Sequence, residues 1–241
     1  MKILVFQHLV VEHPGILRDF WAQAGHRWDT VELDAGEPIP PLEPYDLLAV
    51  MGGPMDVWQE DLLPWLVPEK VAIRRWVMEL GRPFLGICLG HQLLAEALGG
   101  KVGLMARPEV GMGTVSLTAA GLDDPLLAGF PATVETFQWH GAEVSRLPDG
   151  AVVLAANEAC PVQAMRWGRH AYGFQYHVEI TATTVADWQA IPEYAASLDA
   201  ALGVEQAAGL GDAVAARLGD FQIAARRIHD NFEGLVASAR R

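Results

Sequence analysis

Residues 84–92 read Phe-Leu-Gly-Ile-Cys-Leu-Gly-His-Gln, and they join an apolar run of strand length to a run of helical pattern. Gly86 and Gly90 on either side of Cys88 permit a sharp strand-to-helix turn that presents the thiol at its apex. The amino end of the helix expected at 89–98 favours a thiolate through its dipole and free N–H groups. The pattern predicts a nucleophilic cysteine on an elbow, and a buried structural cysteine is the alternative.

Strands and helices alternate on the amino-terminal side of this elbow. Apolar runs of strand length occur at 2–6, 28–33, 46–51 and 84–87, and helical patterns occur at 14–24, 68–80 and 89–98. This order predicts parallel strands joined by right-handed crossovers. Short strand-like runs follow at 114–117, 133–138, 151–156, 162–166 and 171–175. We therefore predict an α/β fold, with a doubly wound, open, mixed and mostly parallel sheet and helices on both faces.

The chain becomes Ala-rich and helical in pattern from Thr181 onward. An apolar stripe there steps by alternating four and three residues, through Val214, Leu218, Phe221, Ala225, Ile228, Phe232 and Leu235. A terminal helix packed on the domain explains such a stripe, and a dimer interface or a cover for a site is the alternative. We expect a catalytic domain at 1–190 and a helical extension at 191–241 packed on the same domain.

The composition excludes several classes of protein. The 241 residues include 17 Lys and Arg against 30 Asp and Glu, a net charge of −13, which argues against binding to nucleic acid or a membrane surface. With 51% hydrophobic and 20% charged residues, the chain is not intrinsically disordered. No leader peptide and no membrane-spanning run is evident, and two cysteines do not form a disulfide framework. We expect a reduced, cytoplasmic protein.

A nucleophilic thiol needs a general base and a group that orients the base. His177-Val178-Glu179 follows a strand-like run, and in extended backbone His177 and Glu179 lie on one face. Eight histidines compete for the role, and spacing alone does not choose between His140 and His177.

Met51-Gly52-Gly53-Pro54 ends the most apolar amino-terminal strand. Ligands of parallel sheets bind at the carboxyl ends of strands, where Cys88 is also expected. A Gly-Gly turn there can direct a backbone N–H at a substrate oxygen, and an ordinary turn is the alternative. Dinucleotide, phosphate-loop and metal-ligand spacings are absent, so we expect no cofactor and no metal.

Three motifs together make the chain resemble the class I glutamine amidotransferases. They are Gly-Ile-Cys-Leu-Gly-His-Gln at 86–92, Met-Gly-Gly-Pro at 51–54 and His-Val-Glu at 177–179. The resemblance covers about residues 1–190 and is strongest to stand-alone proteins similar to the glutaminase half of GMP synthase. It implies a flavodoxin-like fold and hydrolysis of the side-chain amide of glutamine through a γ-glutamyl thioester, releasing glutamate and ammonia.

The same resemblance implies the roles of individual residues. Cys88 would be the nucleophile, His177 the general base and Glu179 the group that orients His177. Backbone N–H groups of Gly53 and Leu89 would form the oxyanion hole. Substrate would be bound by Gly52, Gln92, His140 and Gly141. Ala142 and Val178 depart from the Asp and Pro that the family often carries, and the first departure bears on substrate detail.

Two alternatives keep the same fold. A γ-glutamyl peptidase would use the same triad on γ-glutamyl peptides or conjugates, and a non-catalytic regulatory subunit would retain the fold alone. Because no ATP-pyrophosphatase domain follows before Arg241, the expected partners are a γ-glutamyl small molecule and a separate synthase subunit that receives ammonia. A homodimer is a further expectation.

Overall fold

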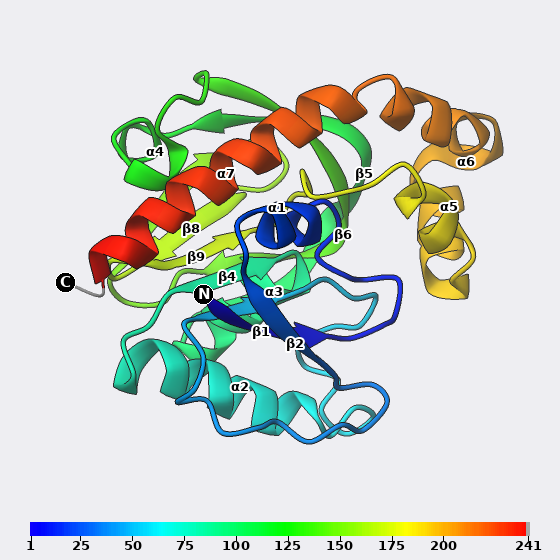
Figure 1. Ribbon diagram of the computed structural model, residues 1–241. Coiled ribbons are helices and arrows are strands. Elements are labelled where there is room, and N and C mark those ends of the chain that lie inside the picture. Colours follow the sequence, from blue (N-terminus) through cyan, green and yellow to red (C-terminus); the bar gives the residue numbers. More distant parts are fainter. Residues whose placement is uncertain (240–241) are drawn as a thin grey trace.

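The computed structural model describes residues 1–239 and contains a nine-stranded sheet between two layers of helices (Figure 1). The strands are β1 (Lys2–Gln7), β2 (Arg27–Glu32), β3 (Leu47–Val50), β4 (Phe84–Ile87), β5 (Lys101–Leu117), β6 (Thr133–Arg146), β7 (Ala151–Ala156), β8 (Ala164–Trp167) and β9 (Ala171–Phe174). Their order in the sheet is β2-β1-β3-β4-β9-β8-β7-β5-β6. Neighbours from β2 to β9 are parallel and the remaining neighbours are antiparallel, which confirms the predicted mixed α/β sheet.

The helices cover both faces of the sheet. They are α1 (Leu17–Gln23), α2 (Leu66–Arg74), α3 (Leu89–Ala97), α4 (Ala119–Leu122), α5 (Thr184–Gln189), α6 (Pro192–Ala215) and α7 (Leu218–Ala239). A π-helical turn, η1 (Arg75–Glu79), continues α2, and a 3₁₀ turn, η2 (Pro125–Leu127), follows α4. Helices α1 and α7 lie on the opposite side of the sheet from α2 (Figure 1).

Alternation along the central strands explains the two layers. In β1, Ile3 and Val5 belong to the core beneath α1 and α7, whereas Leu4 and Phe6 belong to the core beneath α2 and α3. All four side chains are fully buried, as parallel strands with both faces covered require. The carboxyl ends of β3, β4 and β9 therefore meet at one edge, directly before the segments that carry the predicted site residues.

Three expected element boundaries are wrong: the start of α1, the start of β5 and the end of β6. The first helix begins at Leu17 and not at Pro14, because Gly15 has a φ of 53° and the N–H of Ile16 donates to the carbonyl of Glu179 at 2.8 Å. Strands β5 and β6 extend well beyond 114–117 and 133–138. Pro108 lies within a register shift of β5, between Leu104 and Glu109, so the sequence pattern is interrupted although the strand continues.

The carboxyl-terminal stripe packs on the domain. Phe221, Ala225, Ile228 and Phe232 of α7 are at most 5% exposed and belong to the same core as strands β1, β3, β4 and β9. Helix α6 bends at Gly203, whose φ of 73° and ψ of 161° are not helical. Among the described residues, no helix combines the length and apolarity that crossing a membrane requires.

The burial of α7 predicts unequal effects of two truncations on one helix. Phe221 is 1% exposed and Ile223 is 61% exposed. We expect Phe221→Ala to lower the free energy of unfolding by about 3–5 kcal/mol through the cavity it leaves. Ile223→Ala is the matched control and should change it by roughly 0.5 kcal/mol or less. Urea titration of both variants measures the difference, and equal effects would contradict the packing of α7.

Candidate active site

The elbow at Cys88 is a strained turn between β4 and α3. Cys88 has a φ of 53° and a ψ of −105°, and it is the one residue other than glycine with a positive φ in residues 1–239. A Cβ on Gly86 would lie 2.4 Å from the carbonyl oxygen of Gly90, and one on Gly90 would lie 2.0 Å from that of Val50. Both positions therefore require glycine, as the sequence pattern around Cys88 predicts.

The Cys88 thiol is 6% exposed and lies against two polar groups. Its Sγ is 3.9 Å from the carbonyl oxygen of Trp139, and Nε2 of Gln175 donates to Sγ at 3.7 Å. Nε2 of Gln92 in turn donates to Oε1 of Gln175 and to the carbonyl of Ala142, both at 3.1 Å. A continuous hydrogen-bond chain thus connects β6, α3 and the end of β9 at the thiol.

His177 and Glu179 form a buried ion pair next to this thiol. Nδ1 of His177 donates to Oε1 of Glu179 at 2.7 Å, while its Nε2 is buried without a hydrogen-bond partner among the described residues. Burial alone lowers the pKa of His177, but the charge of Glu179 and the nearby Cys88 outweigh it and hold that pKa well above its usual value. Paired backbone hydrogen bonds with Phe137 of β6 fix the position of His177.

The turn after β3 brings a second backbone element to the thiol. The N–H groups of Gly53 and Leu89 have no hydrogen-bond partner among the described residues. The carbonyl of Gly52 accepts a hydrogen bond from Nδ1 of His8 at 2.8 Å. Nε2 of His8 donates to Oε1 of Glu69 at 2.8 Å, and both side chains are fully buried. The His8–Glu69 pair therefore supports the Gly52–Gly53 turn through the carbonyl of Gly52.

A third buried carboxylate, Glu12, connects the site to α6. Tyr194 of α6 donates its hydroxyl to Oε1 of Glu12, which is 3% exposed. Oε2 lies so close to Gly52 that a Cβ there would be 2.3 Å away. Burial raises the pKa of Glu12 to about 7, against the opposing charge of His177. Helix α6 therefore covers the catalytic edge through a buried hydrogen bond.

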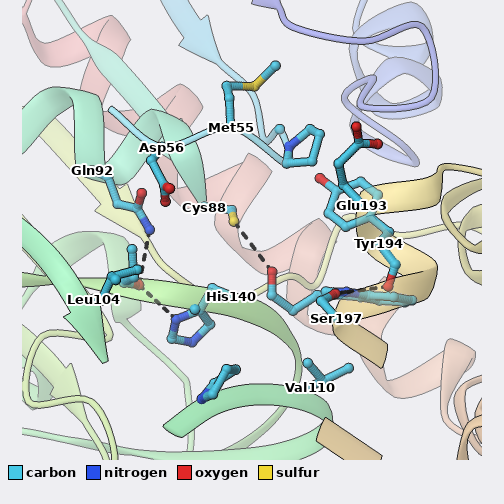
Figure 2. Close-up of a pocket in the computed structure, with 16 residues that line it drawn as sticks. Met55, Asp56, Cys88, Gln92, Leu104, Val110, His140, Glu193, Tyr194 and Ser197 are labelled. Carbon is cyan, nitrogen blue, oxygen red and sulfur yellow. Dashed lines mark hydrogen bonds between the residues drawn. The ribbon is translucent and has the colours of Figure 1, made fainter. Parts of the chain in front are cut away.

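A pocket of about 200 Å³ opens at Cys88 between these elements (Figure 2). Its lining includes Gly53, Cys88, Gln92, Trp139, His140, Gly141 and Ala142 from the sheet and α3, with Met55, Asp56, Glu193, Tyr194 and Ser197 around them. Both ring nitrogens of His140 are engaged, Nδ1 with the carbonyl of Ala142 at 3.0 Å and Nε2 with Oε1 of Gln138 at 3.1 Å. The geometry thus favours His177 over His140 as the base for Cys88.

The structure brings together most of the residues that the sequence indicates. Gly53, Cys88, Gln92, His140 and Gly141 line the pocket, and Leu89 follows the thiol directly. His177 interacts with the Cys88 thiol and with Glu179, whereas Gly52, within the turn after β3, is not among the residues that line the pocket.

Several site residues were not predicted from the sequence. The sequence could have indicated Gln175, because this residue lies two positions before His177 and therefore on the same face of extended backbone. Tyr194 and Glu12 lie 182 residues apart, and no local pattern connects them. Likewise, His8 and Glu69 meet only after β1 and α2 have packed together.

Comparison with known proteins agrees with this geometry. The sequence profile of the family "Glutamine amidotransferase class-I" matches residues 18–187. The chain belongs to the class I glutamine amidotransferase family.

Individual members of this family match most of the chain. The glutamine amidotransferase-like protein YfeJ of Salmonella typhimurium is 34% identical over 77% of the chain and 78% of its own length. A glutamine-hydrolyzing GMP synthase subunit of Sulfolobus acidocaldarius is 33% identical over 64% of the chain and 78% of its own length. The chain spans only 24% of the longer GMP synthases that it also matches. The crystal structure of a Thermotoga maritima glutamine amidotransferase superposes with a TM-score of 0.85 and 27% identity over 98% of both chains.

The raised pKa of Glu12 predicts a pH-dependent cost of folding. Because this pKa lies at about 7 in the folded protein and at 4.5 ordinarily, stability is complete below pH 4.5 and declines as the pH rises through 7. We expect Glu12→Gln to lie within about 1 kcal/mol of the wild type at pH 5 and to exceed its free energy of unfolding at pH 8 by about 3 kcal/mol.

Urea titrations at pH 5 and pH 8 measure this difference. Glu158→Gln, at an exposed position, is the matched control and should leave the difference between the two pH values unchanged. A Glu12→Gln variant that tracks the wild type at both pH values would show that Glu12 titrates normally.

Proposed function

We propose that this protein hydrolyses the side-chain amide of glutamine through a Cys88–His177–Glu179 triad. The observation that carries the proposal is the convergence of three features at one sheet edge. A thiol on a strained elbow lies next to a buried His–Glu pair, and both adjoin a pocket of about 200 Å³. Membership of the class I glutamine amidotransferase family supports the same reaction.

The chemistry follows from the positions of the three groups. His177 takes the thiol proton at Nε2, and the Cys88 sulfur attacks the amide carbon to form a C–S bond. The C–N bond then breaks as His177 returns the proton to the departing nitrogen, which leaves as ammonia. Water, deprotonated by the same nitrogen, attacks the γ-glutamyl thioester, and glutamate leaves as the thiol forms again. Glu179 holds the ring in the required tautomer and stabilises its charged form.

The arrangement can also stabilise the negative charge that develops on the substrate oxygen. The unpaired N–H groups of Gly53 and Leu89 would donate to this oxygen in the tetrahedral states. The His8–Glu69 pair contributes by fixing the Gly52 carbonyl, and hence the peptide that follows it. These donors are held before substrate arrives, so little reorganisation is needed during the reaction.

The charge of the pocket favours glutamine over γ-glutamyl peptides. Asp56 and Glu193 contribute carboxylates to the lining, and the described lining residues include no Lys or Arg. The leaving group of glutamine is ammonia, which brings no negative charge into the pocket. A γ-glutamyl peptide would bring a second carboxylate toward Asp56 and Glu193, at an electrostatic cost.

The test is glutamate release by the purified chain from glutamine, a γ-glutamyl dipeptide and a γ-glutamyl amine. A clear preference for the dipeptide would replace this proposal with the peptidase alternative.

A separate synthase subunit is the proposed acceptor of the ammonia. The Sulfolobus acidocaldarius relative is named as a subunit of GMP synthase, and it is matched over 78% of its length. We infer a comparable partner for this chain. Co-purification with a synthase subunit that raises glutamine turnover would support it.

The two cysteines provide a matched pair of variants for the nucleophile. Cys88→Ala should abolish glutamate release, because the thioester forms on this sulfur. Cys160→Ala should retain it, since burial raises the pKa of the Cys160 thiol to about 12 and leaves it inert. Residual turnover by purified Cys88→Ala protein, with a circular dichroism spectrum like that of the wild type, would contradict the thiol mechanism.

The different roles of His177 and Glu179 predict a graded loss. His177→Asn removes the group that transfers the proton, and kcat should fall by about 10²–10⁴-fold. Glu179→Gln keeps a hydrogen-bond acceptor on Nδ1 and removes only the charge, so the fall in kcat should be smaller. Steady-state kinetics of both variants test the order. A larger loss in Glu179→Gln would mean that Glu179 itself takes part in proton transfer.

A further inference from the structure

A cluster of metal-ligating side chains lies outside the pocket, where α1 and α7 pack together on one face of the sheet (Figure 1). His26 comes from the turn between α1 and β2, and His229 and Glu233 lie one helical turn apart on α7. One nitrogen of each histidine and one oxygen of Glu233 all lie within 4.8 Å of one another. The sequence does not indicate this cluster, because His26 and Glu233 are 207 residues apart.

His229 is oriented as a metal-binding histidine would be. Its Nδ1 lies 3.0 Å from Oδ1 of Asp230, so this nitrogen carries the proton and donates it. Its Nε2 then carries the lone pair, is buried without a hydrogen-bond partner among the described residues, and lies 3.9 Å from Oε1 of Glu233. The side chain is 4% exposed. Two acceptor atoms thus face each other at a distance that a cation between them would explain.

His26 completes the set from the other side. Its Nε2 is hydrogen-bonded to the same oxygen of Glu233, and its Nδ1 lies 2.9 Å from the amino group of Met1. To bind a metal at Nε2, His26 must carry its single ring proton on Nδ1, where the uncharged amino group of Met1 would accept a hydrogen bond from it. Glu233 has a side chain that is 36% exposed, so solvent can reach the cluster and supply a fourth ligand.

We propose that His26, His229 and Glu233 bind a divalent transition metal ion, with Zn²⁺ as the best match. Two imidazole nitrogens with one carboxylate oxygen form a ligand set that zinc takes in proteins, with water in the fourth position. Imidazole also suits copper and nickel, whereas calcium and magnesium prefer oxygen ligands throughout. Asp230 is the carboxylate that orients one of the imidazoles.

The metal would act as a structural clamp and not in the glutaminase reaction. None of the three ligands lines the pocket at Cys88. The ion would instead join the turn after α1 to the carboxyl-terminal helix, which has few other polar contacts with the amino-terminal segment in the described residues. Binding to the folded state alone raises the thermal midpoint, roughly 5 °C or more at a hundredfold excess over Kd for a chain of this size.

Zinc binding by the full chain tests the proposal in a Cys88→Ala background, which removes the reactive thiol as a competing ligand. After treatment with EDTA and gel filtration, isothermal titration with ZnCl₂ should give one equivalent bound, with a higher thermal midpoint. Glu233→Gln and His26→Asn should each weaken binding at least tenfold. Asp220→Asn, an exposed carboxylate on the same helix, is the matched control and should bind as the parent does.

Two results would overturn the site. One is the absence of stoichiometric zinc uptake by the folded parent at 100 µM, roughly the upper end of Kd for a useful site. The other is equal affinity in the parent, Glu233→Gln and His26→Asn. If a ligand variant fails to fold, Asp230→Asn replaces it and should weaken zinc binding about 10–100-fold. Glutamate release by the wild type is measured separately, so failure of the metal site leaves the proposed function untouched.

Discussion

The backbone at Cys88 is the constraint on which the catalytic edge depends. The sparsely populated backbone conformation of Cys88 costs about 1–3 kcal/mol, and here it is offset by hydrogen bonds to both neighbouring strands. The N–H of Cys88 donates to Phe174 of β9 at 2.7 Å, and that of Gly90 donates to Met51 after β3 at 3.1 Å. The turn that follows β4 is therefore hydrogen-bonded to the ends of both β9 and β3, and it places the thiol at the edge of the sheet. The free N–H of Leu89 arises from the same turn, so one structural feature positions both the proposed nucleophile and the proposed oxyanion donor.

Buried ionisable groups surround this edge, and two arrangements compensate for their loss of solvent. His177 with Glu179, and His8 with Glu69, are paired at 2.7 and 2.8 Å. The carboxylate of Glu12 accepts its hydrogen bond from a neutral phenol, and burial shifts its pKa upward accordingly. Breaking a buried pair leaves an uncompensated charge, which is costlier than losing a contact between neutral groups. The same electrostatic cost therefore opposes separation of the His177–Glu179 pair and of the His8–Glu69 pair that supports the Gly52–Gly53 turn.

Local chemistry was predictable from the sequence, and long-range contacts were not. Gly86, Cys88 and Gly90 are close together in the chain, and their steric requirements are a property of one turn, so the elbow and the parallel half of the sheet followed from the residues. In the antiparallel half, β5 and β6 were predicted too short, and in β5 Pro108 interrupts the pattern without ending the strand. The pairs formed by His8 and Glu69 and by Glu12 and Tyr194 depend on tertiary packing. A single sequence contains no spacing that joins them.

Helix α6 forms part of the pocket wall without belonging to the elbow or the sheet. It is anchored at the site by the Tyr194–Glu12 hydrogen bond, by stacking of Tyr194 on Trp188 at 5.4 Å, and by the bond from Trp139 to Ser197 at 2.8 Å. These anchors place Glu193 and Ser197 at the pocket, yet α6 contributes no residue to the triad or to the sheet (Figure 2). Substitutions on this helix can change the charge and volume that a leaving group meets without moving Cys88 or His177. The part of the pocket wall formed by α6 is therefore separable from the elbow that carries the proposed nucleophile, because the two are built on different elements.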